Sequence, residues 1–186
     1  MAGGYPHHLV ENQRLPDGTP VLIRPIAADD RHRHWRFVCS LSLQTRYHRL
    51  MSARFLLPGE LRRMVEVDYH HEMALVAIAQ TAQGESEVGV ARYVRSEAGE
   101  GDGDGAEFAI VVADTWQRRG LGELLLHRLR NAAAASGIRH LGGLTLATNR
   151  PMIRLARRLG FDISSEPGDW TVKRVSWRQA AAVSTQ

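Results

Sequence analysis

Residues 106–136 change their hydrophobic pattern once, and the change predicts a strand followed by a helix. Residues 107–113 form a β-branched and aromatic run without proline or glycine, which is typical of a buried strand. After a turn with two glycines, apolar residues recur at spacings of three and four, as on one face of an amphipathic helix. These residues are Leu121, Leu124, Leu125, Leu129, Ala132 and Ala133. Gly137 follows where a helix commonly ends.

The same patterns predict the other elements and a single domain. The expected helices cover residues 29–40, 41–50, 59–67 and, after an N-cap at Asn149, 150–159. The expected strands cover residues 21–26, 73–79, 87–94, 139–148, 161–163 and 170–175. We expect a flexible segment over 1–19, one domain over 20–178 and a tail over 179–186. His32 and His34 lie two apart in a predicted helix, so we expect solvent-facing histidines rather than a metal site.

Composition narrows the class of protein. Of 186 residues, 44% are hydrophobic and 24% charged, as in globular domains, and no apolar run is long enough for a membrane span. The single cysteine, Cys39, excludes an internal disulfide and predicts a cytoplasmic protein. A net charge of +4 suits a polyanionic small ligand, but the charge is too modest and scattered to predict nucleic-acid binding. No metal site is expected.

The turn before the central helix predicts a phosphate ligand. The first N–H groups of a helix lack internal partners, and its dipole adds positive charge there. Gly120 and Gly122 would let the backbone approach the ligand, and Arg118 and Arg119 add charge. The turn lacks the Lys-Ser/Thr ending of a P-loop and the glycine order of a dinucleotide-binding turn. Residues 117–122, Gln-Arg-Arg-Gly-Leu-Gly, instead resemble the pyrophosphate-binding signature of the GNAT superfamily of acyl-CoA-dependent N-acyltransferases.

Further residues strengthen and narrow this resemblance. Asn149 followed by a helix and Gly160-Phe161 is similar to a second GNAT signature, so the resemblance covers about residues 20–176. It implies an α/β (α+β) fold, a single domain with a central mixed, mostly antiparallel twisted sheet flanked by helices. Ile23-Arg24-Pro25-Ile26, Asp68-Tyr69 and Ala106-Glu107-Phe108-Ala109 look like the acetyltransferase domain of bacterial Pat-type protein-lysine acetyltransferases. The acyl-CoA-synthetase-like or cyclic-nucleotide-binding regions of those proteins have no counterpart in this sequence.

The resemblance implies a set of site residues. Glu107 matches the catalytic glutamate of Pat-type domains and is expected to act as the general base. A strand bulge near Ile110, Val111 or Val112 is expected to supply a main-chain donor for the thioester oxygen. The expected acetyl-CoA-binding residues are Ile110, Val111, Val112, Gln117, Arg118, Arg119, Gly120, Leu121, Gly122, Glu123, Asn149 and Met152. Ala156 occupies the position where many relatives carry a tyrosine, which leaves the general acid unassigned.

The predicted function is transfer of an acetyl group from acetyl-CoA to a primary amine by direct attack in a ternary complex. The expected acceptor is a protein lysine, in a pocket built by the N-terminal helices and the loop over 96–105. A small-molecule amine, and a non-catalytic acyl-CoA-binding regulatory role, stay open as alternatives. We expect a monomer or homodimer with no membrane or nucleic-acid partner.

Overall fold

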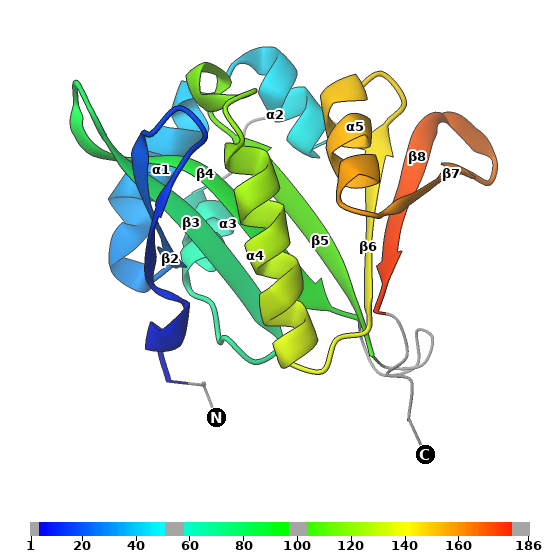
Figure 1. Cartoon of the computed structure of the whole chain (residues 1–186), viewed down its shortest axis with the longest axis horizontal. Coiled ribbons are helices and arrows are strands. Elements are labelled where there is room, and N and C mark those ends of the chain that lie inside the picture. Colours follow the sequence, from blue (N-terminus) through cyan, green and yellow to red (C-terminus); the bar gives the residue numbers. More distant parts are fainter. Residues whose placement is uncertain (1–3, 51–57, 97–103, 180–186) are drawn as a thin grey trace.

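A computed structural model describes residues 4–50, 58–96 and 104–179 of the chain, and its centre is one eight-stranded sheet (Figure 1). The strands are β1 (Glu11–Arg14), β2 (Pro20–Pro25), β3 (Glu72–Thr81), β4 (Gly84–Arg95), β5 (Gly105–Val112), β6 (His140–Leu146), β7 (Asp162–Glu166) and β8 (Asp169–Arg178). Their order across the sheet is β1-β2-β3-β4-β5-β6-β8-β7, and only β5 and β6 run parallel. The predicted mixed, mostly antiparallel sheet is therefore confirmed.

Helices cover both faces of this sheet. They are α1 (Arg31–Ser40), α2 (Leu43–Leu50), α3 (Pro58–Val65), α4 (Leu121–Ala135) and α5 (Arg150–Arg158), with short 3₁₀ turns η1 (His7–Leu9), η2 (Ala28–Asp30) and η3 (Asp114–Trp116). In Figure 1, α4 and α5 lie in front of the sheet, and α1 and α3 lie behind it. Because β5 and β6 are parallel, the connection between them runs through α4 and crosses one face of the sheet.

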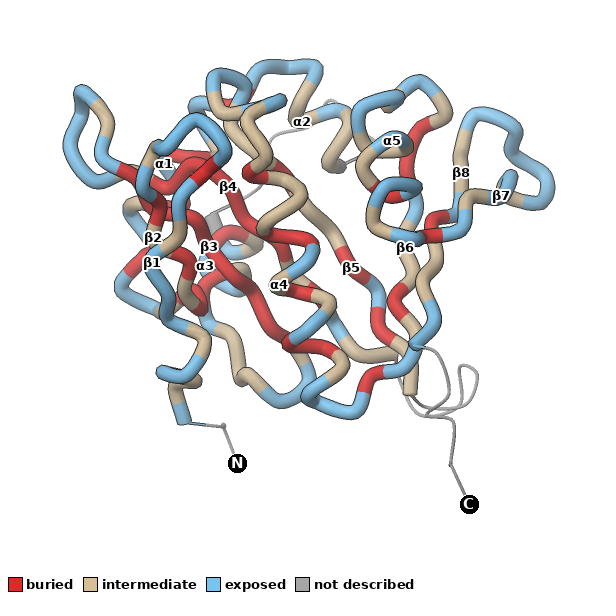
Figure 2. The backbone as a smooth tube through the Cα atoms, in the orientation of Figure 1, coloured by how far each residue is buried: buried red, intermediate tan, exposed pale blue. Residues whose placement is uncertain are grey.

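Two hydrophobic clusters, one on each face, fix the central strands. Leu121, Leu125 and Leu129 of α4 are almost fully buried in the first cluster, as the spacing predicted. Leu126, which was not predicted, is also buried, whereas the predicted Leu124 is only partly buried. Phe37 of α1 and Leu41, which follows the helix, are buried in the second, with alternate residues of β3 and with Val90 and Val111. The buried stretches in Figure 2 accordingly follow β3, β4 and the inner side of α4. This two-sided burial explains why β3 reads as a continuous apolar run rather than an alternating one.

The N-terminal segment differs from its prediction. Residues 11–14, expected to be flexible, form the edge strand β1, which pairs antiparallel with β2. Leu15 beyond it is buried in the cluster that contains α4. The predicted tail over 180–186 and most of the expected loop over 96–105 lie outside the described residues. No helix among the described residues is long and apolar enough to cross a membrane.

Candidate active site

The turn before α4 presents main-chain donors, as the sequence predicted. Gly120 precedes the helix with φ +86°, and no described side chain caps the N–H groups of the first turn. Arg118 also takes a positive φ, of +59°. Within the described part of the chain, the N–H groups of Leu121, Gly122 and Glu123 have no protein acceptor. Together with the helix dipole, these N–H groups suit an anionic group such as a diphosphate.

The two glycines of this turn serve packing as well as conformation. A Cβ on Gly120 would lie 2.8 Å from Cδ of Pro16, and one on Gly122 would lie 3.3 Å from Cδ2 of Leu155. Both missing side chains therefore point at protein atoms, whereas the sequence suggested that they cleared a path for a ligand. Gly120 lets the turn rest on the β1–β2 connection, and Gly122 lets α4 approach α5.

The side chain of Arg119 stabilises the turn. Its Nε donates to Asp17 at 2.9 Å, its Nη2 donates to Thr19 at 2.7 Å, and its guanidinium lies 4.4 Å from the ring centroid of Trp116. Hydrogen bonds from Thr19 and Arg119 lower the pKa of Asp17 to about 2, so the pair is ionised at neutral pH. Arg118, in contrast, is exposed.

Gln117 and Asp114 tie α2 to the same region. The Nε2 atom of Gln117 donates to the carbonyl of Val112 at 3.1 Å and to Thr45 Oγ1 at 3.2 Å. Asp114 accepts hydrogen bonds from the N–H of Ser42 at 2.9 Å and from the hydroxyls of Ser42 and Thr45 at 2.6 and 2.7 Å. Although desolvation opposes it, these hydrogen bonds lower the pKa of Asp114. The start of α2 is thus fixed to the turn that follows β5.

The main chain of β5 becomes accessible where β6 diverges. The parallel pairing runs from Gly105 to Glu107 on β5 and from His140 to Gly142 on β6, and Figure 1 shows the two strands separating beyond it. The N–H of Ala113 donates to the Val88 carbonyl, which fixes the alternation along β5. The N–H groups of Ile110 and Val112 therefore face the gap.

This arrangement corrects the expectation of a bulge. The β4–β5 register is unbroken from Ala106 to Val112, so strand divergence, rather than a bulge in β5, exposes the donors. Val111 differs from its two neighbours, because its N–H faces β4 and its side chain is buried in the cluster behind the sheet. Gly143 occupies the point of divergence, where a Cβ would lie 2.9 Å from the Phe108 carbonyl oxygen.

Glu107 lies at the edge of a wide pocket where the β5–β6 pairing ends. Its side chain is exposed, and the pocket, here called the Glu107 pocket, encloses about 890 Å³ with its open mouth included. The described lining residues are Ser96, Asp104, Gly105, Ala106, Glu107, His140, Gly142, Gly143, Leu144 and Arg174. The Glu107 carboxylate is near enough to Arg49 of α2 to interact with its charge. The carboxylate is therefore open to solvent.

Asn149 and Met152, two of the residues predicted to bind acetyl-CoA, stabilise the fold at the start of α5. Asn149 Oδ1 accepts from the Met152 N–H at 3.3 Å, and Nδ2 donates to Thr145 Oγ1 at 3.2 Å. Asn149 is therefore the N-cap of α5, and Met152 packs against the core cluster under α4. Ala156 is completely buried. Glu123, in the first turn of α4, pairs with Arg158 of α5 at 3.0 Å.

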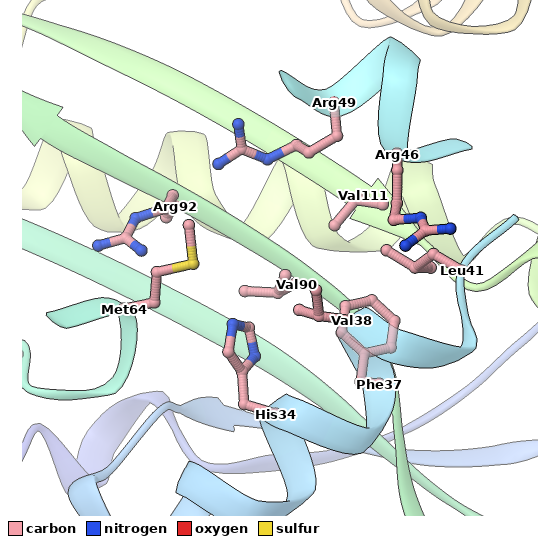
Figure 3. A pocket seen from close by; sticks show the side chains of 10 residues that line it. All are labelled: His34, Phe37, Val38, Leu41, Arg46, Arg49, Met64, Val90, Arg92 and Val111. Carbon is pink, nitrogen blue, oxygen red and sulfur yellow. The ribbon is translucent and has the colours of Figure 1, made fainter. Parts of the chain in front are cut away.

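A second pocket lies behind the sheet, under the N-terminal helices (Figure 3). Its cavity measures about 30 Å³, within about 480 Å³ of space that includes the open mouth, and it is here called the arginine pocket. Its described lining residues are His34, Phe37, Val38, Leu41, Arg46, Arg49, Met64, Val90, Arg92 and Val111. His34 is 4% exposed, and its Nδ1 lies 2.9 Å from Oε1 of the buried Glu87. The expectation of a solvent-facing His34 was therefore wrong.

Comparison with known proteins identifies the family. The model of the acetyltransferase (GNAT) family matches residues 43–161. Acetyltransferase PA5475 of Pseudomonas aeruginosa is 35% identical over 166 residues, which are 88% of this chain and 86% of that protein. The chain belongs to the GNAT family of acetyltransferases. It is thus an acyl-CoA-dependent N-acetyltransferase that uses acetyl-CoA as co-substrate.

Solved structures and a further relative agree with the GNAT assignment. The GNAT domain of S. lividans PAT superposes with a TM-score of 0.83 at 28% identity, over 94% of this chain and 99% of that one. Acetyltransferase Pat of Mycolicibacterium smegmatis is 31% identical over 74% of this chain, which is 40% of the length of that protein. The yncA protein of Salmonella typhimurium, solved with acetyl-CoA, shares the fold at a TM-score of 0.68 and 19% identity, over 89% of this chain and 99% of that one.

Several site-forming residues of this GNAT enzyme carried no sequence signal. Asp17 and Thr19 are 100 or more positions from Arg119, and Asp114 is about 70 positions from Ser42 and Thr45. Glu87 looked like an ordinary strand residue. Within the described residues, no group of three or more His, Cys, Asp or Glu side chains could hold a metal ion.

Proposed function

We propose that this acetyltransferase transfers the acetyl group to the side-chain amine of a protein lysine, with Glu107 as general base. The observation that carries the proposal is the position of Glu107. An exposed carboxylate lies on the strand that offers free N–H groups at Ile110 and Val112, and it borders a wide solvent-open pocket. Likeness to the mycobacterial Pat and to the S. lividans PAT domain supports a protein acceptor.

The chemistry requires a base on the acceptor side. A lysine amine has a pKa of about 10.4, so about one in two thousand is neutral near pH 7. Glu107 would take the proton, directly or through water, as the amine attacks the thioester carbonyl. The N–H groups of Ile110 and Val112 would then stabilise charge on the carbonyl oxygen, and the C–S bond would break to release CoA thiol.

The turn before α4 would hold the other end of the co-substrate. In this proposal the N–H groups of residues 121–123 and the exposed Arg118 bind the CoA diphosphate, while Arg119 keeps the turn in place. Gln117 leaves the Val112 N–H free, because its side chain bonds the carbonyl of that residue instead. Asn149 and Met152 contribute by fixing the start of α5 beside the gap.

The decisive experiment compares thiol release from acetyl-CoA by the wild type and by Glu107→Gln, with lysine-containing peptides as acceptors. We expect the variant to lose about 10²- to 10⁴-fold in kcat/KM and to lose the acidic limb of the pH profile. Glu85→Gln, an exposed change at the start of β4, serves as the matched control and keeps the wild-type rate. A full rate for Glu107→Gln across pH would exclude this residue as the base.

The acceptor class needs its own measurement. A proteome incubated with the wild type and isotope-labelled acetyl-CoA should gain label on lysine side chains, and a parallel sample with Glu107→Gln should not. If label instead accumulates only on small amines such as polyamines, the protein-lysine part of the proposal fails. Binding of acetyl-CoA without transfer to any acceptor would indicate a non-catalytic module.

A further inference from the structure

The arginine pocket combines an apolar floor with cationic walls. Phe37 of α1, Val90 of β4 and Val111 of β5 line its floor. Figure 3 shows the side chains of Arg46 and Arg49 extending from α2, and that of Arg92 from β4. Val111 lies on β5 between Ile110 and Val112, the residues whose N–H groups face the gap. The pocket therefore reaches the strand segment on which the proposed function places the acyl group.

None of the described lining residues is acidic, although carboxylates lie nearby. Arg92 pairs with Glu72 at 2.5 Å, outside the lining, and Glu107 is close enough to affect Arg49. Burial, followed by repulsion from Arg92, nevertheless lowers the pKa of Arg49 to about 10. The negative charge of Glu107 raises this pKa, but by less than burial and Arg92 lower it. The surroundings of Arg49 thus favour an additional negative charge.

His34 adds a further donor at the base of the pocket. Its Nε2 atom is buried and has no hydrogen-bond partner among the described residues, while Nδ1 contacts Glu87. Burial raises the pKa of Glu87, against the opposing effect of His34. When Nε2 carries the hydrogen, it is a buried donor that has no acceptor among the described residues.

We propose that the arginine pocket binds a carboxylate carried on a short apolar chain. Such a group would place its methylenes on Phe37, Val90 and Val111 and its oxygens among the N–H groups of Arg49, Arg92 and His34. The inference rests on the proposed function in one respect: the carboxylate belongs either to the acyl chain of an acyl-CoA, such as a succinyl group, or to an acceptor with an acidic group beside its amine.

Calorimetry with two acyl-CoA thioesters tests the first source. Succinyl-CoA and butyryl-CoA have acyl chains of four carbons, and only succinyl-CoA ends in a carboxylate. We expect wild-type protein to bind succinyl-CoA about tenfold or more tightly than butyryl-CoA, because hydrogen bonds to charged groups contribute at least this factor. Arg49→Gln should abolish the preference. Arg36→Gln, which removes an exposed positive charge from α1 outside the pocket, should retain it.

Peptide kinetics test the second source. With acetyl-CoA fixed, kcat/KM is compared for lysine peptides that differ by one neighbouring glutamate or glutamine. A preference for the glutamate peptide that Arg49→Gln abolishes, without a preference among the thioesters, would assign the carboxylate to the acceptor. His34→Asn keeps a donor to Glu87 but removes the nitrogen that faces the pocket, and it should reduce whichever preference exists. Melting temperatures of all variants exclude a general loss of folding.

A third arm separates this inference from the proposed function. Butyrate and butyramide are compared by ligand-observed NMR, since neither requires CoA binding or turnover. Saturation transfer to butyrate that exceeds transfer to butyramide, and that disappears in Arg49→Gln, supports the pocket even if acetyl-CoA fails to bind. Equal responses to both probes, together with thioester and peptide ratios below about twofold, would overturn the inference.

Discussion

Gly120→Ala should destabilise the turn before α4 through two separable effects. An L-residue at φ +86° occupies the left-handed region, which costs about 1–2 kcal/mol. The new Cβ would lie 2.8 Å from Cδ of Pro16, whose ring cannot rotate away, and overpacking of this kind costs about 1–3 kcal/mol. We therefore expect a loss of about 2–5 kcal/mol in the free energy of unfolding.

Urea unfolding of matched variants measures the two contributions. Gly137, after α4, has φ +79°, and a Cβ there would have no described atom within 4 Å, so Gly137→Ala should cost the backbone contribution of about 1–2 kcal/mol. Pro16→Ala combined with Gly120→Ala should recover part of the remaining loss, because the double variant removes the contact. Equal costs for Gly120→Ala and Gly137→Ala would refute the packing role that we assign to Gly120.

The same variants connect the turn to co-substrate binding. If the N–H groups of residues 121–123 hold the diphosphate, a displaced turn should weaken acetyl-CoA binding about tenfold or more, as measured by calorimetry under conditions where both variants are folded. Gly137→Ala, at the other end of α4, should leave the dissociation constant unchanged. Wild-type affinity in a Gly120→Ala protein with the expected stability loss would place the diphosphate elsewhere.

Three further perturbations test other parts of the structure. The pKa of Asp17 is lowered from 3.8 to about 2, so its contribution to stability is complete above about pH 4 and is lost as the pH falls through 2. Asp17→Asn should therefore remove this pH dependence from acid-unfolding curves. Gly143→Ala should cost about 1–3 kcal/mol in urea unfolding, because its Cβ meets the Phe108 carbonyl oxygen, whereas Gly142→Ala, with no described atom within 4 Å, should cost less. His34→Leu should cost about 3 kcal/mol by leaving Glu87 buried without its partner, and His34→Leu with Glu87→Leu should recover most of that loss.

Local periodicity was sufficient to predict most of the fold. The four-residue spacing of Leu121, Leu125 and Leu129 predicted the buried face of α4, and the long apolar run predicted β3, because burial on one or two faces leaves a direct pattern in the sequence. Strand β1, Glu-Asn-Gln-Arg, was missed because a polar edge strand has no such pattern. Its strand conformation depends on pairing with β2, which is tertiary information.

The site was predictable only where main-chain conformation is encoded by residue type. The N-cap role of Asn149 follows from local chemistry and was anticipated. Gly120 was expected to let the backbone approach a ligand, and its positive φ was not predicted. Burial of His34 could not be anticipated, because two histidines two positions apart on a helix face different directions and only the packing decides which is inside. The arginine pocket could not be predicted from the sequence either, since α1, α2, α3, β4 and β5 each contribute to its lining.

The two ends of the proposed co-substrate site are mechanically connected through η3 and α2. Asp114 of η3 holds Ser42 and Thr45, and Thr45 also accepts from Gln117, the first residue of the turn that leads to α4. Arg46 and Arg49, which line the arginine pocket, follow on the same helix. Since a helix of eight residues moves largely as a unit, a displacement of the turn by a bound diphosphate would also move these guanidinium groups. If the proposed diphosphate and carboxylate sites are both correct, α2 is the structural support that they share.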